Sequence, residues 1–484
     1  MQSLTFEETE IQRLFGHEAA EDEEPERLRA YYFKSDTYDK VITELPLRIL
    51  VGHKGIGKSA LFKVAIAEDN DHHELPILIR PDDILGLAPN ASDFLQLIRD
   101  WKKGLLTIIA QKALTALGSD EATWKAKTAQ VAGKLIDFIL QTVQGQESVS
   151  LDPTRKAIAQ RLSRSRRVVV YIDDLDRGWQ GQRENVVRIS ALLNAVRDIA
   201  SEHKGVLFKI SLRSDVYFLV RTSDESTDKI EGSVVWHTWL NHEIFALLVK
   251  RIETFFGRSP HERDLLSTPQ PVLARYLEPV MEPMFQGTGH WNNAPIYRVL
   301  MSLIRKRPRD LVKLCTLAAR AARSDGAKKI LTGHFQGVFE EYSQGRIQDT
   351  VNEFRSELPD IERLLMNMKP NRKERTTKAG YVYKTDALLQ KIGNIMQSGA
   401  FRLQNGREAT AKGLASFMYK INFLTARKEA EGRIVRKYFE ENRYLSSQFA
   451  DFGFDWEIHP AYRWALQPES IEDIFRSLQL SGDD

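Results

Sequence analysis

The chain has 484 residues, of which 42% are hydrophobic and 28% charged, and its formal net charge is +3. This length exceeds what a single hydrophobic core usually organises, so two or three domains are expected. The composition is that of a globular protein in water. It excludes a uniformly basic chain, so any nucleic-acid-binding surface must be local.

A single cysteine, Cys315, excludes an internal disulfide and fits a reducing compartment. Its neighbours in the pattern LVKLCTLAA are apolar, which favours a packed core thiol over a nucleophile. The sequence shows no signal-peptide pattern and no apolar run long enough to cross a bilayer. We therefore expect a cytoplasmic protein without a membrane partner.

Residues 1–30 are expected to form an acidic arm. A short amphipathic start leads to the run Glu21-Asp22-Glu23-Glu24 before Pro25. Such a run favours a solvated segment over a specific site for a basic partner. The following stretch, Tyr31–Glu44, leads into the first strand, and its Phe33 is interpreted as a core residue more than as a contact to a nucleotide base.

The most informative stretch is Leu47–Ala60, LRILVGHKGIGKSA, in which residues 52–59 match G-x-x-x-x-G-K-[ST]. A short apolar strand precedes the match and helix-forming residues follow it, which is the strand–loop–helix context of a P-loop. The predicted nucleotide-binding residues are Gly52, His53, Lys54, Gly55, Ile56, Gly57, Lys58, Ser59 and Ala60.

Each residue type in this loop has a physical reason. Glycine allows positive φ and close approach of the backbone to a phosphate, and the N–H groups of the loop and helix start bind the anion. Lys58 is expected to reach the β- and γ-phosphates, and the Ser59 hydroxyl to ligate Mg²⁺. The motif therefore predicts ATP and Mg²⁺ as ligands.

A second strand is predicted over Leu75–Ile79. Apolar spacing then predicts two long helices within residues 91–143, a larger insertion than a simple crossover needs. A polar linker over residues 145–153 and a short helix over residues 154–163 follow.

The next strand is predicted in VVVYIDDLDR, residues 168–177. Its apolar, β-branched run is typical of a strand buried on both faces, and ligands bind at the carboxyl ends of such strands. Asp173 is expected to hold Mg²⁺ and Asp174 to orient or deprotonate an attacking water. Asp176 remains the alternative catalytic carboxylate.

A further strand is predicted over residues 206–213, within VLFKISLRSD. In P-loop ATPases with a strand inserted between the two Walker strands, a polar residue here senses the γ-phosphate. Arg213 is the first candidate and Ser211 the second, while an Arg213–Asp215 surface pair is the structural alternative. Residues 234–236 predict a fifth strand. Lys250 and Arg251, on the helix after it, are expected to face solvent.

Beyond residue 258 the pattern becomes helical. The segment RKRPRDL, residues 305–311, places Pro308 in the first turn of a helix and Arg309 at its start. The helix that begins near Pro308 is predicted to continue through Ala322. A second helix is predicted over His334–Phe354. The basic polar stretch KPNRKERTTK, residues 369–378, predicts a domain boundary.

The last module is predicted to be winged-helix-like. Helices over residues 385–397 and 410–419 precede strands over 432–438 and 454–459. The cations of this module are Arg427, Lys428, Arg433, Arg436 and Lys437. We interpret them as a solvent-exposed charged face, with a DNA-binding surface as the alternative. Its aromatic residues favour a small core over a stacking platform; they are Trp456, His459, Tyr462 and Trp464.

The expected fold class is α/β, a P-loop NTPase with a central, mostly parallel sheet and a strand inserted between the Walker A and Walker B strands. A helical lid-like domain and a C-terminal winged-helix-like α+β module follow. The expected segments are the arm 1–30, the ATPase core 31–258 with its insertion 91–143, the lid-like domain 259–368 and the C-terminal module 369–484.

The motifs GHKGIGKSA, VVVYIDDLDR, LRSD and RKRPRDL resemble those of bacterial KAP- and STAND-type P-loop ATPases, relatives of AAA+ proteins. The resemblance covers residues 31–325 well and the C-terminal module only loosely. It implies that Asp173 is the Walker B ligand, Asp174 the catalytic acid and Arg213 a sensor. It also implies that Arg309 reports the nucleotide state.

The resemblance further implies a homo-oligomeric switch ATPase that controls a separate effector, a nuclease or toxin, in antiphage defence. Aspartate at position 174, where AAA+ proteins usually carry glutamate, predicts slow or partner-stimulated turnover. Two alternatives stay open: a DNA-gripping motor or loader that uses the C-terminal module, and an interaction protein that binds ATP without turnover.

Overall fold

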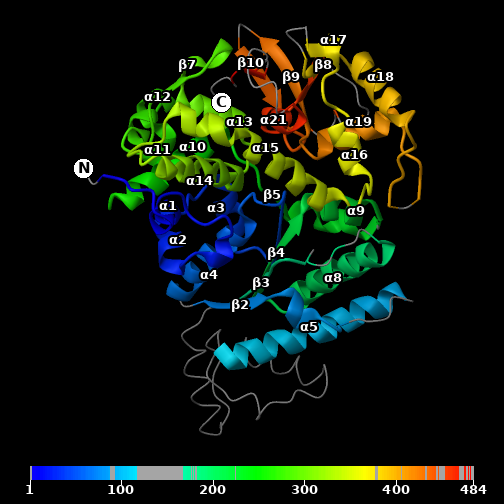
Figure 1. The fold of residues 1–484 in the computed structure, drawn as a ribbon. Helices are drawn as coiled ribbons and strands as arrows, with labels where there is room; N and C mark the ends of the chain where they lie inside the picture. The colour runs from blue at the N-terminus through cyan, green and yellow to red at the C-terminus, as the bar shows by residue number, and fades with distance from the viewer. Residues whose placement is uncertain are drawn as a thin grey trace, which may run out of the picture. The chain divides into compact units, whose positions relative to one another are not determined.

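Five parallel strands form the central sheet, in the order β2-β3-β4-β1-β5. In this computed structural model the strands are β1 (Leu47–Gly52), β2 (Leu75–Ile79), β3 (Val168–Ile172), β4 (Val206–Arg213) and β5 (Val234–Trp236) (Figure 1). Strand β4 lies between β1 and β3, as an inserted strand does. The order and the parallel direction confirm the predicted α/β fold class.

The structure describes residues 3–480 with gaps. The long gap covers residues 117–166; the short ones are 73, 88–92, 176, 178, 180–181, 224, 376–379, 405, 431–432, 443–444, 446–452, 468–473, 476–477 and 479. The second predicted insertion helix, the linker over 145–153 and the helix over 154–163 lie outside the described residues.

Helices cover the sheet because its strands are apolar on both faces; all five residues of β3 are buried. These helices are α3 (Asp36–Ile42), α4 (Lys58–Asp71), α5 (Phe94–Ala116), α8 (Arg183–Glu202) and α9 (Ser214–Ser223). Helix α5 packs on α8, and α8 packs on β4 (Figure 1). The first helix of the predicted insertion is therefore part of the core packing of the sheet.

The chain divides into two compact units. The sheet unit comprises Lys34–Lys54 and Lys58–His237, and the helical unit comprises Met1–Phe33, Gly55–Gly57 and Thr238–Asp484. The predicted boundaries after residues 258 and 368 stay predictions.

Up to residue 366, the helical unit is built from helices and one small hairpin. Its helices up to residue 366 are α1 (Glu8–Phe15), α2 (Pro25–Tyr31), α10 (Asn241–Phe255), α11 (Glu262–Ser267), α12 (Gln270–Leu273), α13 (Ile296–Leu303), α14 (Pro308–Ser324), α15 (Thr332–Phe354) and α16 (Ile361–Met366). Pro308 occupies the first turn of α14, as predicted. The hairpin β6 (Met284–Gln286) and β7 (Asn292–Pro295) was not predicted.

The last part of the helical unit is an antiparallel sheet with four described α-helices, α17 (Arg372–Arg375), α18 (Thr385–Met396), α19 (Ala411–Lys420) and α21 (Arg463–Leu466). The strand order is β10-β9-β11-β8, with β8 (Val382–Tyr383), β9 (Leu424–Ala430), β10 (Arg433–Lys437) and β11 (Asp455–Ile458). The two predicted strands are present as β10 and β11, but β9 lies between them and pairs with both. Trp456, His459, Tyr462 and Trp464 are buried, which confirms the small aromatic core.

The interpretation of the N-terminal segment as a solvated arm was wrong for its helix and for Glu23, although Glu21, Asp22 and Glu24 are exposed. Helix α1 buries Ile11, Leu14 and Phe15 and packs on α10 and α14. Within the acidic run, the buried Glu23 accepts hydrogen bonds from Arg27 Nη1 at 2.8 Å and from the Tyr31 hydroxyl at 2.6 Å. Carboxylates can be buried when they are paired, so acidity alone did not predict solvation.

Lys250 and Arg251 do not face solvent. Lys250 is buried, and its ammonium donates to the carbonyl of Tyr32 at 2.6 Å and to Glu262 at 2.5 Å. The Arg251 guanidinium donates to the carbonyl of Phe15 and lies over the Tyr31 ring. Both cations hold the N-terminal segment on α10.

An ionic cluster, Arg305, Asp310, Arg346, Thr350 and Tyr462, is buried at the start of α14. The Asp310 carboxylate, 1% exposed, accepts from Arg305 Nε at 2.7 Å and from Arg346 Nη1 at 2.5 Å. The two guanidinium groups hold the pKa of Asp310 well below its usual range although burial alone would raise it. Arg305 Nη1 also donates to Thr350 and to the Tyr462 hydroxyl, so the cluster joins α14, α15 and the C-terminal region.

Cys315 is buried in α14, where burial raises the pKa of its thiol to about 12. This confirms the packed core thiol. Across the described part of the chain, none of the helices combines the length and apolarity needed to span a membrane.

Candidate nucleotide-binding site

The P-loop connects β1 to α4. Gly55 and Gly57 have φ of 79° and 109°, a region that residues with a Cβ rarely adopt. Helix α4 begins at Lys58, so Ser59 and Ala60 lie in its first turn, where backbone N–H groups have no partner within the helix. The loop has the curvature and the helix start that phosphate binding needs.

The Lys58 ammonium lies over the loop's own backbone. It donates to the carbonyl oxygens of Gly52 at 2.9 Å and His53 at 3.2 Å. Lys54, in contrast, is exposed. Of the two lysines in the motif, Lys58 is therefore the one held within the loop.

His53 anchors the loop to the end of a neighbouring strand. Its side chain is 3% exposed, and its Nδ1 lies 3.1 Å from the Oγ of Ser214, the first residue of α9. Strand β4 leads directly into α9, and β4 pairs with β1. The His53–Ser214 contact thus joins the P-loop to the segment that follows β4.

Asp173 follows β3 at the same edge of the sheet as the P-loop, because β1, β3 and β4 are parallel. Its Oδ1 accepts hydrogen bonds from the Ser211 hydroxyl and from the backbone N–H of Asp174 at 3.0 Å. The carboxylate is thereby oriented by β4. Its donor atoms are hard oxygens, as in Mg²⁺ sites.

Asp174 is exposed and has a φ of 57°, a left-handed conformation that aspartate tolerates better than most residues. The N–H of Arg177 donates to the Asp174 carbonyl at 2.9 Å, which closes a tight turn. The turn presents the Asp174 side chain to solvent beyond the end of β3. Asp176 lies outside the described residues.

Arg213 at the end of β4 is held by Asp215. Its Nε and Nη2 contact the two carboxylate oxygens at 3.0 and 2.8 Å, and Asp215 is 4% exposed. The predicted Arg213–Asp215 pair is therefore present, but it is largely buried and not a surface pair. Ser211, the second sensor candidate, is the β4 residue that contacts Asp173.

Gly55, Ile56 and Gly57 belong to the helical unit, where Arg309 packs against Gly55. The N–H of Arg309 lies 3.4 Å from the Gly55 carbonyl, and a Cβ at Gly55 would lie 3.1 Å from the Arg309 Cβ. The Trp239 indole also donates to the Ile56 carbonyl at 2.9 Å. Arg309 thus lies against a P-loop glycine, and its role there stays a prediction.

The residues fit a nucleotide with its magnesium ion. The loop supplies positive-φ glycines, a helix start and an ammonium group for phosphates, and Ser59 and Asp173 supply a hydroxyl and a carboxylate for the metal. The fold is that of a P-loop NTPase. The assignment of a role to each of these residues remains a proposal.

His237, which follows β5, is fully buried near this site, and burial together with the charge of Lys58 lowers its pKa to about 3. An unfolded histidine titrates near pH 6.5, so the folded state binds this proton less readily. The contribution of the neutral His237 side chain to the free energy of unfolding is therefore fully present above about pH 6.5. It falls by up to about 1.4 kcal/mol per pH unit as the pH drops towards 3.

Urea denaturation at pH 7.5 and pH 5 measures this effect. The difference in midpoint between the two pH values is expected to shrink in His237→Gln and to persist in the control His290→Gln, whose histidine is exposed. Part of the difference will remain, because burial also lowers the pKa of His459. An unchanged pH dependence in His237→Gln would contradict the assignment.

Comparisons with known proteins show what this chain is similar to. A family model described as the FunZ-associated C-terminal helical domain matches residues 242–351, from α10 into α15. The putative transposon gamma-delta 80.3 kDa protein of Escherichia coli (strain K12) is 23% identical over 514 residues, covering 95% of this chain and 69% of that protein.

Three solved structures are similar at low identity. The Walker-type ATPase of Pyrococcus abyssi has a TM-score of 0.40 at 12% identity, covering 90% of this chain and 96% of that one. The Aeropyrum pernix ORC2 protein has a TM-score of 0.38 at 11% identity, covering 94% of this chain and 93% of that one. The Aeropyrum pernix ORC1 protein in complex with DNA has a TM-score of 0.32 at 13% identity, covering 98% of this chain and 94% of that one. Scores and identities at this level transfer no residue role to this chain.

Sequence reasoning missed Ser214 and Trp239. Ser214 stands directly after the predicted strand in LRSD, so its position at the sheet edge was visible, but its pairing with His53 was not. Trp239 carries no local signal, because its contact to Ile56 joins residues 183 positions apart.

Proposed function

We propose that this protein is an ATP- and Mg²⁺-dependent ATPase that acts as a regulatory switch. The observation that supports it most is the Asp173 carboxylate, which Ser211 orients at the sheet edge where β1 enters the P-loop. A P-loop followed by a helix and an oriented carboxylate on a nearby parallel strand is the arrangement that P-loop ATPases use.

In this proposal each residue has a defined task. The loop 52–60 and Lys58 bind the phosphates, and Ser59 and Asp173 hold Mg²⁺. The ion would neutralise charge that develops on the phosphate oxygens. Asp174 orients the attacking water and takes its proton, and Ser211 or Arg213 responds to the γ-phosphate.

Contacts within the helical unit support a switch more than a metabolic enzyme. Arg309 packs on Gly55, and its neighbour Asp310 belongs to the buried ionic cluster. Lys306 pairs with Glu441 at 2.8 Å, and Arg307 with Glu353 at 3.1 Å. The segment 305–310 therefore connects a P-loop glycine to α15 and to the C-terminal residues Glu441 and Tyr462.

The finer parts of the proposal rest on the motifs that resemble KAP- and STAND-type ATPases. They are a cytoplasmic homo-oligomer, control of a separate nuclease or toxin, and a role in antiphage defence. Identification of the neighbouring genes would test the effector, and mass measurement with and without ATP would test assembly.

Replacement of Asp174 by asparagine tests the chemistry. We expect ATP binding to persist while phosphate release slows about 100-fold or more, because the amide cannot accept the proton. Single-turnover phosphate release measures this, with Asp39→Asn at an exposed position of α3 as the control. Wild-type turnover in Asp174→Asn would move the catalytic role to Asp176 or another carboxylate.

A second candidate is a DNA-gripping ATPase. Lys428 is exposed on β9, and the Escherichia coli relative is named as a transposon protein. Against it, Arg436 is buried in an ion pair with Glu457 at 2.6 Å, which removes one predicted cation from the surface. Duplex-stimulated hydrolysis with affinity that falls steeply with salt would favour this candidate.

No phosphate release with any partner or nucleic acid would contradict both candidates. The remaining interpretation would then be an interaction protein that binds ATP without turnover.

A further inference from the structure

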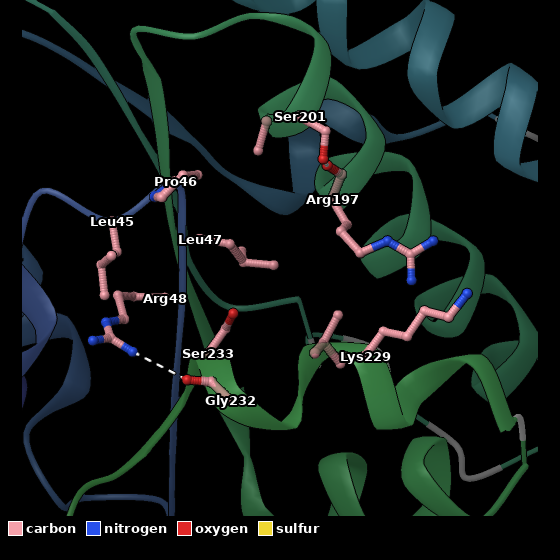
Figure 2. Close-up of a pocket in the computed structure, with 11 residues that line it drawn as sticks. Leu45, Pro46, Leu47, Arg48, Arg197, Ser201, Lys229, Gly232 and Ser233 are labelled. Atoms are coloured by element: carbon pink, nitrogen blue, oxygen red, sulfur yellow. Dashed lines mark hydrogen bonds between the residues drawn. The ribbon is translucent and has the colours of Figure 1, made fainter.

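A pocket of about 300 Å³ lies in the sheet unit at the start of β1, away from the P-loop (Figure 2). Its walls come from β1, the end of α8 and the 3-10 helix Glu225–Ser233. Strand β1 runs from Leu47 at the pocket to Gly52 at the P-loop, a rise of about 17 Å at about 3.3 Å per residue. The pocket is therefore separate from the nucleotide site.

The charged residues that line this pocket are all positive. Arg48, Arg197 and Lys229 line it, and none of its lining residues is acidic. Three glutamates adjacent in sequence to lining residues are instead paired with cations outside it: Glu44 with Arg167 at 2.6 Å, Glu231 with Arg221 at 2.8 Å, and Glu202 with Lys102. These three carboxylates thus pair with cations outside the pocket, and within the residues that the structure describes only Asp198 contacts a lining cation, Arg197, at 3.5 Å.

Arg197 has hydrogen-bonding capacity left over. Its Nη1 is buried without a hydrogen-bond partner among the described residues, and its Nη2 reaches Asp198 only at 3.5 Å. Figure 2 shows the Arg197 and Lys229 side chains extending along the same side of the pocket. Two cations on one wall without a carboxylate between them repel each other, and a bound anion would relieve this.

Arg48 is already positioned. Its Nη1 donates to the carbonyl of Gly232 at 3.3 Å and its Nε to the Thr43 hydroxyl at 3.2 Å. These bonds hold the guanidinium at the rim. The hydroxyls of Ser201 and Ser233 add polar groups, and Leu47 adds an apolar surface.

We propose that this pocket binds a small organic phosphate, such as a sugar phosphate or a mononucleotide. Guanidinium groups match the geometry of phosphate oxygens and form strong charge-assisted hydrogen bonds. The volume lies at the lower limit of small-molecule pockets, which fits one sugar or base with its phosphate and not a dinucleotide. The apolar wall receives the organic part. This site does not depend on the proposed ATPase activity.

Calorimetry on the full chain tests the proposal. The titrants are ribose 5-phosphate and AMP, and the P-loop is kept saturated with a non-hydrolysable ATP analogue and Mg²⁺. We expect one saturable site per chain for at least one of the two phosphates, and no binding of ribose or adenosine. Parallel titrations of Lys58→Ala are expected to retain this site, which separates it from the P-loop whatever the fate of the proposed function.

Variants of the pocket complete the test. Lys229→Gln is expected to weaken binding at least 10-fold, and Arg197→Gln to do the same if it folds. Lys103→Gln, at an exposed position of α5, should leave binding unchanged. Three results would each overturn the proposal: no saturable binding, binding that both pocket variants retain, and binding that Lys58→Ala alone removes. Binding of an acidic peptide in place of both phosphates would also overturn it.

Discussion

Replacement of Lys58 by alanine is expected to abolish ATP binding. The ammonium group lies within the loop on the carbonyls of Gly52 and His53, so it is already placed where phosphates would approach. Charge-assisted hydrogen bonds contribute about 1.5–3 kcal/mol each, and an ammonium that bridges two phosphates makes more than one. We therefore expect affinity to fall at least about 100-fold.

Equilibrium binding of a fluorescent ATP analogue with Mg²⁺ measures this loss. Lys54→Ala is the matched control, because Lys54 belongs to the same loop but is exposed and contributes to the motif through its backbone. Circular dichroism should show both variants folded. Tight binding by Lys58→Ala, or an equal loss in Lys54→Ala, would contradict the assignment of Lys58.

Asp310→Asn is expected to destabilise the helical unit by about 3–5 kcal/mol, the usual cost of leaving a buried charge without its partner. The carboxylate contacts Arg305 and Arg346, and all three side chains are at most 3% exposed. The neutral amide would leave two buried guanidinium groups facing each other. The single carbonyl oxygen of asparagine replaces two charged oxygens, and Arg305 keeps its bonds to Thr350 and Tyr462.

Urea denaturation followed by tryptophan fluorescence reports this change, since Trp291 and Trp464 are buried in the same unit. The matched control is Asp349→Asn, whose carboxylate also pairs with Arg346, at 2.9 Å, but is 47% exposed. Its cost should stay below about 1 kcal/mol, as for other solvent-exposed ion pairs. Equal costs for both variants would show that the buried cluster does not stabilise the fold.

The strands of the central sheet were predictable because their signals are local. Apolar runs such as Val168–Ile172 identify a buried strand whatever lies around them. The glycine spacing of the P-loop and the proline at the start of α14 are equally local. The fold class followed from these patterns and from the known order of P-loop sheets.

Which of Ser211 and Arg213 contacts Asp173 could not be predicted in this way. Both follow the same alternation and lie on one face of β4, so only the register against β3 distinguishes them. Ile172 pairs with Ile210, which brings the next residues, Asp173 and Ser211, level with each other. Register depends on packing between strands distant in the sequence.

The cations of α10 were misjudged for a related reason. Lys250 bonds to Tyr32 and Arg251 to Phe15, partners 218 and 236 residues away. The charge pattern of neighbouring residues in the sequence does not indicate such a distant partner. The short strands β6 and β7 escaped prediction because they span three and four residues, too few for alternation to be recognised.

The division of the chain has a consequence for its synthesis. Residues 1–33 pack on helices that lie beyond residue 238, whereas Lys34–His237, apart from Gly55–Gly57, form the sheet unit. During translation the sheet unit can fold first. Residues 1–33 can pack in their native positions only after α10 and α14 have left the ribosome. Until then the apolar residues Ile11, Leu14 and Phe15 lack their native cover.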